Sequence, residues 1–196
     1  DRSFDDKDVA LLTEIALQRT DIAPLKLDWE QLPAALDPGR NGKAGYALPQ
    51  ARAERKRAQV ESLLAIAAVV LPDSGEAAIV EFGAGCGHVG LLLAHLYPKC
   101  TVTLVERKRL ACDQATERAK ASQIDNVTVF CGDIASFRRD CAGFDIGVGL
   151  HCCGALTDAA LAACVECAAA AVICPCCYGQ FAAPPAAADA SGEVPA

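Results

Sequence analysis

One stretch of the 196-residue chain decides its fold: Glu81-Phe82-Gly83-Ala84-Gly85-Cys86-Gly87-His88-Val89-Gly90. It continues the apolar residues 77–80 and leads into residues 88–97, which have the apolar density of a buried helix. Glycines at a strand-to-helix turn let the backbone approach a ligand closely, and the helix N-terminus beyond them offers free N–H groups. The stretch therefore predicts a strand, a ligand-binding turn and a helix.

Predicted strands and helices alternate along the chain after this turn. Apolar runs rich in β-branched residues predict strands over 101–106, 127–130, 144–150 and 171–174. Helices are predicted over 110–122 and 156–167, and a further one precedes the first strand over 52–71. Strict alternation of strands that are apolar on both faces indicates a parallel sheet covered by helices. We predict an α/β, Rossmann-like doubly wound domain, with a mostly parallel sheet and helices on both faces.

Three regions are expected along the chain. Residues 61–181 form the Rossmann-like domain, residues 1–60 an N-terminal helical and irregular extension, and residues 182–196 a flexible tail rich in Ala and Pro. The chain has no methionine, and five predicted strands are few for this architecture. We therefore expect the chain to be part of a longer protein and the domain to be incomplete at its C-terminal strands.

Composition restricts the class of partner. The chain carries 18 Lys and Arg against 25 Asp and Glu, a net charge of −7, which argues against coating DNA or membranes through a bulk positive field. It contains neither an uncharged apolar run long enough to span a membrane nor a secretion signal. We expect a cytoplasmic protein with no membrane or DNA partner. Its twelve cysteines are then buried hydrophobes, metal ligands or nucleophiles rather than a disulfide framework.

Two acidic residues at predicted strand ends complete the ligand site. Glu106 ends the second strand, where it can accept hydrogen bonds from two ribose hydroxyls, and Asp133 follows the third strand. A glycine turn with a strand-end acid indicates an adenosine-type cofactor. The pattern Gly85-x-Gly87-x-x-Gly90 is that of NAD-binding proteins, but Gly83-x-Gly85-x-Gly87 fits better because it starts where the apolar run stops.

This second pattern, with Glu81 two residues before it, resembles motif I of class I S-adenosylmethionine-dependent methyltransferases. In that superfamily an acidic residue at the place of Asp133 commonly faces the adenine amino group. The resemblance implies S-adenosylmethionine as the cofactor. It also implies that the cofactor is bound by the following residues: Glu81, Gly83, Gly85, Gly87, Glu106, Asp133 and His151.

Three further stretches carry a more specific resemblance. They are LPQARAERKRAQVE (residues 48–61), LHCCGALTD (150–158) and PCCYG (175–179). Together they resemble the methyltransferase domain of the family of glutathione S-transferase C-terminal domain-containing proteins. They are more distantly similar to the family that 2′-O-methylates the tRNA acceptor stem. The resemblance implies a methyltransferase that acts on RNA, either tRNA or rRNA.

The ends of the fourth and fifth strands are expected to border the reactive part of the cofactor. Methyl transfer needs alignment above all, and a weakly acidic acceptor also needs a base, for which His151 is the candidate. The alternative is that His151 only hydrogen-bonds the backbone. Tyr178 either stacks on a planar acceptor or packs within its loop. Cys176 or Cys177 either attacks a pyrimidine covalently or only shapes the pocket.

Two alternatives concern metal and RNA. His151 and the neighbouring cysteines could ligate a metal, but Cys-x-Cys-Cys lacks the ligand spacing of structural zinc sites, so we expect none. Four basic residues before the core are candidate RNA phosphate contacts, or else a solvated helix face. These are Arg52, Arg55, Lys56 and Arg57. Alternatives for the whole chain are an NAD-dependent oxidoreductase or a cofactor-binding module without turnover.

Overall fold

The computed structural model describes residues 22–40 and 47–176 of the chain. Its described residues form one sheet of five parallel strands in the order β3-β2-β1-β4-β5. The strands are β1 (Ala78–Phe82), β2 (Thr101–Glu106), β3 (Val127–Cys131), β4 (Ile146–Leu150) and β5 (Ala170–Cys174). This order places β1 in the middle. The chain adds β2 and β3 on one side of β1 and then β4 and β5 on the other, so the strand order reverses beside the carboxyl end of β1. Ligands bind at such a switch point in open α/β sheets.

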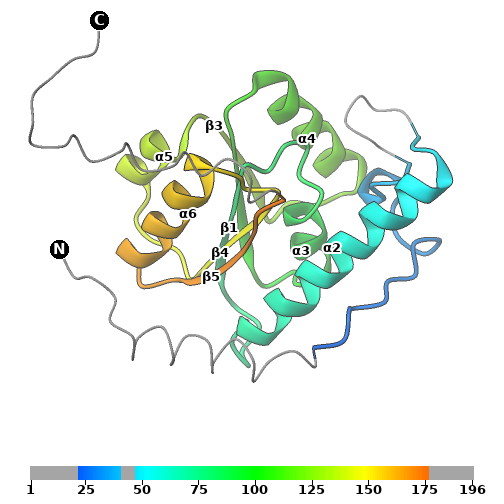
Figure 1. The fold of residues 1–196 in the computed structure, drawn as a ribbon, viewed down its shortest axis with the longest axis horizontal. Coiled ribbons are helices and arrows are strands. Elements are labelled where there is room, and N and C mark those ends of the chain that lie inside the picture. Colours follow the sequence, from blue (N-terminus) through cyan, green and yellow to red (C-terminus); the bar gives the residue numbers. More distant parts are fainter. Residues whose placement is uncertain (1–21, 41–46, 177–196) are drawn as a thin grey trace, which may run out of the picture.

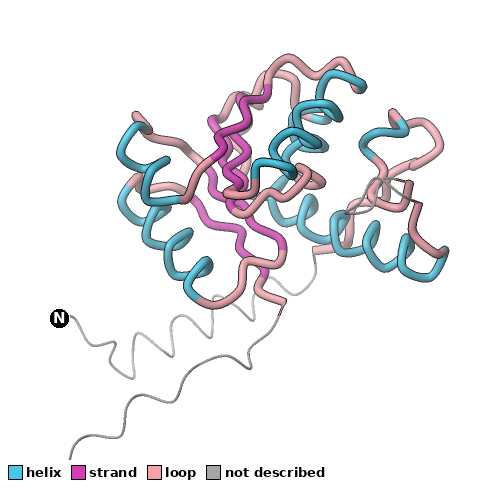
Figure 2. The backbone as a smooth tube through the Cα atoms, turned by 90° about the horizontal axis from the view of Figure 1, so that it is seen from above, coloured by secondary structure: helices cyan, strands magenta, loops and turns pink. Residues whose placement is uncertain are grey.

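Helices cover both faces of the sheet, as Figures 1 and 2 show. The helices are α2 (Gln50–Val70), α3 (Gly90–Leu96), α4 (Arg109–Ala121), α5 (Ile134–Asp140) and α6 (Ala155–Glu166), and a 3₁₀ turn, η1 (Ala34–Leu36), precedes them. Apolar side chains of α2, α3 and α4 pack on one face, and those of α5 and α6 pack on the other. The predicted Rossmann-like doubly wound fold is confirmed.

Alternation along β1 explains why the sheet needs both layers. Ile79 packs with α2 and α3, while Val80 and Phe82 pack with α5 and α6. Phe82 meets the edges of Phe137 and Phe144, with ring centroids 6.3 and 5.7 Å apart. A strand that is apolar on both faces is stable only when both are covered. In the described part of the chain, no helix has the length and hydropathy needed to cross a membrane.

The structure differs from the sequence-based expectations at two places. Helix α5 was not expected, because seven residues are too few to show a helical period. Its signal is Asp133, an N-cap whose Oδ1 accepts a hydrogen bond from the Ser136 N–H at 2.7 Å. The boundary expected between residues 60 and 61 falls inside α2, which buries Val60, Leu63 and Leu64 on one face. Residues 1–21 of the predicted N-terminal extension and the predicted tail 182–196 lie outside the described residues.

Residues 22–40 pack on α2 through a buried ion pair. Asp37 is fully buried, and its two carboxylate oxygens accept hydrogen bonds from Arg57 Nε and Nη2 at 3.0 and 2.6 Å. The Gly39 N–H donates to the same carboxylate at 2.7 Å, and the Arg57 guanidinium lies over the Trp29 ring, 5.6 Å from its centroid. Arg57 is therefore occupied within the fold, which corrects its assignment as a contact for RNA.

This ion pair sets the protonation state of Asp37. Burial raises the pKa of Asp37, but the hydrogen bonds from Arg57 and Gly39 and the charges of Arg57 and Arg40 outweigh burial and hold it below 3.8. A carboxyl with a depressed pKa stabilises the fold above its unfolded pKa, and that contribution is lost as the pH falls through its folded pKa.

Replacing Arg57 by Met should therefore destabilise the protein by about 3 kcal/mol at pH 7, because it leaves a buried carboxylate without its main partner. Urea unfolding followed by circular dichroism measures the loss. The matched control is Arg55→Met on the exposed side of α2, which should change the free energy of unfolding by no more than about 0.5 kcal/mol. Equal losses in the two variants would contradict this role of Arg57.

Candidate active site

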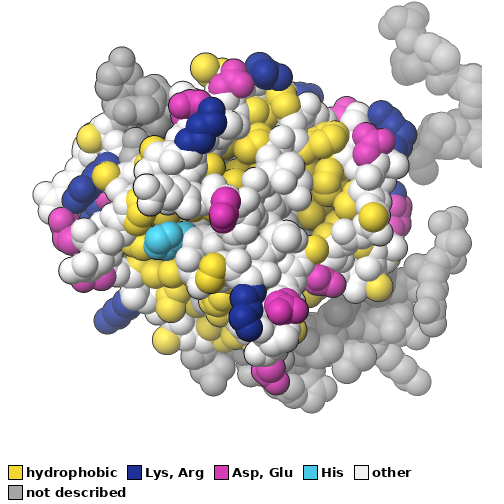
Figure 3. Space-filling model, turned by 180° about the vertical axis from the view of Figure 1, so that it is seen from behind, with side chains coloured by type: hydrophobic (Ala, Val, Ile, Leu, Met, Phe, Trp, Pro, Cys, Tyr) yellow, Lys and Arg dark blue, Asp and Glu magenta, His cyan; other side chains and the backbone are white. Residues whose placement is uncertain are grey.

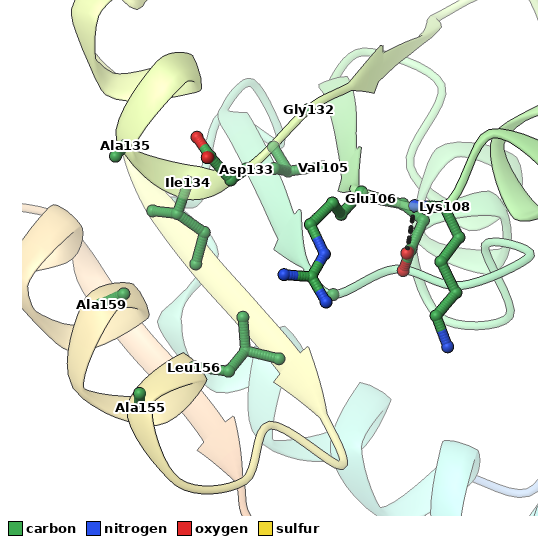
Figure 4. A pocket seen from close by; sticks show the side chains of 12 residues that line it. Val105, Glu106, Lys108, Gly132, Asp133, Ile134, Ala135, Ala155, Leu156 and Ala159 are labelled. Carbon is green, nitrogen blue, oxygen red and sulfur yellow. Dashed lines mark hydrogen bonds between the residues drawn. The ribbon is translucent and has the colours of Figure 1, made fainter.

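A cavity of about 520 Å³ opens at the carboxyl ends of β1, β2 and β3, beside the start of α6 (Figure 4). This volume lies within the usual range for small-molecule and cofactor sites. Glu106 and Lys108 lie on one side of it, Asp133 and Ile134 on another, and Leu156 faces them from α6. The cavity is lined by Gly83, Val105, Glu106, Arg107, Lys108, Gly132, Asp133, Ile134, Ala135, Ala155, Leu156 and Ala159.

The glycine turn begins directly after β1 ends at Phe82. Gly83, Gly85 and Gly87 have φ values of 64°, 56° and 73°, a region that L side chains rarely adopt. A Cβ on Gly83 would lie 2.8 Å from Leu156 Cδ2, so this glycine also allows α6 to approach. Gly90 instead begins α3. The strand thus stops where the Gly83-x-Gly85-x-Gly87 pattern requires, and it does not extend to Ala84 as the NAD pattern needs.

Glu106 joins this turn to the end of β2. Its Oε2 accepts a hydrogen bond from the Gly85 N–H at 2.9 Å, and its Oε1 accepts one from the Lys108 N–H at 2.8 Å. A carboxylate has about four lone-pair sites, so two donors leave capacity for hydroxyl groups of a ligand. Glu106 therefore fixes the turn and remains able to accept hydrogen bonds from a ribose.

Glu81 lies below the turn rather than in the cavity. Only 3% of it is exposed, and its Oε2 accepts a hydrogen bond from the Gly90 N–H at 2.7 Å. Burial raises the pKa of Glu81 to about 7, although the backbone hydrogen bonds from Gly90 and Val89 and the charges of Lys56 and Arg118 oppose the rise. Glu81 thus supports the glycine turn by holding the start of α3. It does not line the cavity, so its predicted role in cofactor binding would be to position the glycine turn.

Asp133 lines the cavity and has a second task. It is exposed, and its cap on α5 lowers its pKa, chiefly through the backbone hydrogen bond from Ser136. It is therefore ionised at neutral pH and able to accept a hydrogen bond from an amino group. The apolar wall formed by Ile134, beside Asp133, and Leu156, which faces it from α6, was missed from the sequence. No local sequence pattern indicates it, because Ile134 and Leu156 are brought together only by the packing of α5 and α6 on the same face of the sheet.

Arg118 supports the same turn from α4 and was also missed. Its Nε donates to the Ala35 carbonyl at 2.7 Å and its Nη1 to the Cys86 carbonyl at 2.6 Å. The side chain is buried, so these bonds join η1, the glycine turn and α4 in one layer. Nothing in the sequence distinguishes Arg118 from the other basic residues of α4, because its partners are backbone carbonyls distant in the chain.

His151 and Cys176, at the ends of β4 and β5, are not among the residues that line this cavity. His151 follows β4 with a φ of 65°, and its N–H donates to the Cys174 carbonyl at 2.9 Å. Partial desolvation, together with the charge of Lys56 on α2, lowers the pKa of the imidazole below 6.5. His151 is therefore neutral at pH 7, the state in which it can accept a proton.

Of the two cysteines predicted as site residues, Cys176 and Cys177, only Cys176 lies within the described residues. Cys176 is exposed, and its Sγ lies 2.8 Å from that of Cys153. Cys152 is fully buried and donates to the Phe82 carbonyl at 3.2 Å, and burial raises its pKa to about 12. Cys177 and Tyr178 lie outside the described residues. Within residues 22–40 and 47–176, no three His, Cys, Asp or Glu side chains are grouped to hold a metal ion.

Residues 55–184, more than half of the chain, match the family model of a methyltransferase domain. The chain belongs to this methyltransferase domain family. Membership confirms the predicted class of protein and, with it, S-adenosylmethionine as the cofactor. The cavity fits that molecule, because it combines acceptors for ribose and amino groups with an apolar wall and a glycine turn.

Curated relatives are similar over most of this chain. The human glutathione S-transferase C-terminal domain-containing protein is 38% identical over 153 residues, which are 78% of this chain and 23% of that protein. Its homolog in Drosophila pseudoobscura pseudoobscura is 42% identical over 135 residues, 69% of this chain and 22% of the relative. The chain thus spans about a quarter of the length of these relatives.

Solved structures are similar at a lower level. A coclaurine N-methyltransferase bound to N-methylheliamine and S-adenosylhomocysteine is 16% identical, with a TM-score of 0.45, over 76% of this chain and 43% of that chain. An rRNA methylase from Streptococcus thermophilus is 17% identical, with a TM-score of 0.44, over 51% of this chain and 58% of that chain. Similarity at this level says nothing about the methyl acceptor.

Replacing Glu106 by Ala should weaken S-adenosylmethionine binding about 10- to 100-fold, since hydrogen bonds to a charged group contribute about 1.5–3 kcal/mol. Isothermal titration calorimetry measures the affinity. Glu117→Ala is the matched control, because Glu117 lies on the exposed side of α4 in an ion pair with Lys120. Unchanged affinity in Glu106→Ala would contradict its place in the site.

Proposed function

We propose that this chain transfers a methyl group from S-adenosylmethionine to RNA. The observation that carries the proposal is the Glu106 carboxylate, which holds the Gly85 and Lys108 N–H groups beside the cavity. Glu106 and Asp133 would hold the adenosine, with Ile134 and Leu156 as the apolar wall. The glycine turn would hold the amino-acid part. When bound, the cofactor supplies an activated methyl group.

His151 takes the proton of the acceptor in this proposal. It lies at the end of β4, next to β1 and thus next to the glycine turn. A ribose hydroxyl or an amine is a weak acid, so its attack on a methyl group is assisted by a neutral imidazole. The lowered pKa of His151 supports this role, because the imidazole stays deprotonated at neutral pH. Three residues remain predictions for the acceptor side: Cys176 or Cys177 as a nucleophile or as part of the pocket wall, and Tyr178 as a stacking ring.

Positively charged side chains near the start of α2 support RNA as the acceptor. Arg52 and Arg55 are exposed, whereas Lys56 is half-buried and Arg57 is paired with Asp37. Acidic and basic side chains are interspersed on the face shown in Figure 3, and the chain carries a net charge of −7. RNA would therefore be positioned by a few local contacts rather than by a general positive field. A cytoplasmic location is part of the same proposal.

His151→Gln should lower the turnover rate far more than the S-adenosylmethionine affinity, because the amide can still form a hydrogen bond as a predicted cofactor contact but cannot take a proton. In the unchanged protein the rate should fall with acid below pH 6.5, as the imidazole becomes protonated. Turnover measured from pH 4.5 to 8 should show this acid limb, and His151→Gln should lack it. An identical acid limb in the variant would assign the proton transfer to another group.

Charge reversal at Arg52 and Arg55 should weaken RNA binding and reduce its salt dependence by about one phosphate contact for each residue. Fluorescence anisotropy with labelled tRNA, at several salt concentrations, measures both quantities. Lys99→Glu is the control, because Lys99 is exposed just before the amino end of β2, whereas the candidate site lies at the carboxyl ends of the strands. Equal effects of Lys99→Glu and Arg52→Glu would contradict a local contact.

The direct test is incubation of the protein with radiolabelled S-adenosylmethionine and separate RNA and protein fractions of a cell extract. The proposal expects label in RNA and none with Glu106→Ala. Label confined to protein would overturn RNA as the acceptor. Cofactor binding without transfer to either fraction would identify a binding module without turnover.

A further inference from the structure

Cys153 and Cys176 form a pair of thiols across the ends of β4 and β5. Their Sγ atoms lie 2.8 Å apart, and the Cys176 N–H donates to Cys153 Sγ at 3.0 Å. Cys153 follows β4 and Cys176 follows β5. The last residues of these strands, Leu150 and Cys174, are partners in the parallel ladder, so the segments that carry the two thiols begin side by side. Cys176 is exposed and Cys153 is half-buried, so small reagents in solvent can reach the pair.

The surroundings of Cys153 favour its thiolate form. The residue directly precedes Gly154, the N-cap of the twelve-residue helix α6, whose positive end lies beside it. The N–H of Cys176 adds a donor to the same sulfur. Lys56 brings a positive charge near the other member of the pair, Cys176. A thiolate stabilised by a helix N-terminus and a cation is the reactive form of cysteine.

We propose that Cys153 and Cys176 are a redox-active dithiol that a hydroperoxide converts into a disulfide. The Cys153 thiolate attacks a peroxide oxygen, the O–O bond breaks, and the sulfur becomes a sulfenic acid while hydroxide leaves. Cys176 then attacks that sulfur as a thiolate, so that the S–S bond forms, the S–O bond breaks and a second hydroxide leaves. With the two thiol protons, two thiols and one hydrogen peroxide give one disulfide and two waters.

The disulfide acts on the site through its position. It ties the exit of β4, which carries His151, to the exit of β5, where the acceptor approaches in the proposed function. The Glu106 side of the cavity lies across β1 and β2 and contains neither thiol. Oxidation is therefore expected to block methyl transfer while S-adenosylmethionine still binds. This consequence rests on the proposed function, whereas formation of the disulfide does not.

Peptide mapping of the peroxide-treated chain tests the disulfide. Cleavage on the amino side of aspartate separates Cys153, in residues 145–157, from Cys176, in residues 158–188. Without reduction these two peptides should be recovered as one cross-linked species that has lost two hydrogen atoms. The cross-link should persist when Cys174 and Cys177 are both replaced by Ser, and also in the control Cys141→Ser. Cys153→Ser should abolish it.

The order of the two steps has its own readout. In Cys176→Ser the reaction should stop at the sulfenic acid, which dimedone then traps on Cys153. A cross-link that survives in Cys153→Ser, the absence of a cross-link in the unchanged chain, or dimedone on another cysteine alone would overturn the proposal.

Methyl transfer is measured on the same samples. Peroxide should abolish transfer, dithiothreitol should restore it, Cys153→Ser should be insensitive to peroxide, and S-adenosylmethionine affinity should be the same before and after oxidation. If the cross-link forms and transfer is unaffected, the regulatory role is wrong. If the reduced protein transfers no methyl group, the proposed function fails while the mapping still decides on the dithiol.

Discussion

The hydrogen bonds of one carboxylate, that of Glu106, hold together the parts of this protein that would bind a cofactor. Gly85 lies in the turn after β1, and Lys108 precedes α4 after β2. Without this shared acceptor, the Gly85 and Lys108 N–H groups would each lose the hydrogen bond that connects the two turns. These hydrogen bonds fix the distance between the glycine turn and the end of β2. The two segments form adjoining walls of the cavity, so the shape of the cavity depends on these bonds.

A buried layer of charged groups supports the glycine turn from the other side. Glu81 holds the first N–H of α3, and Arg118 donates to the carbonyl of Cys86 within the turn. Arg118 also donates to Ala35, so the segment before α2 is connected to the same turn. Lys56 contributes a positive charge near Glu81 and His151. Two basic residues that the sequence offered as RNA contacts, Lys56 and Arg57, thus serve the interior of the fold.

Local sequence was sufficient to predict the alternation of strands and helices, the glycine turn and the two acids at the strand ends. Each of these depends on neighbours in the chain: the apolar period, the residues that tolerate a positive φ, and the position where an apolar run stops. Helix α5 was missed because its seven residues are too few to show a helical period, so that its N-cap Asp133 was its one local signal. Arg118, Leu156 and the Cys153–Cys176 pair could not be predicted, since their partners are brought together only by the parallel order of the strands.

Calorimetric titration of the reduced protein with S-adenosylmethionine and, separately, with NAD tests the central claim most directly. The overlapping glycine patterns differ in where β1 ends, and in the structure it ends at Phe82. The account predicts saturable binding of S-adenosylmethionine at one site per chain and no measurable binding of NAD. Saturable binding of NAD with none of S-adenosylmethionine would contradict it.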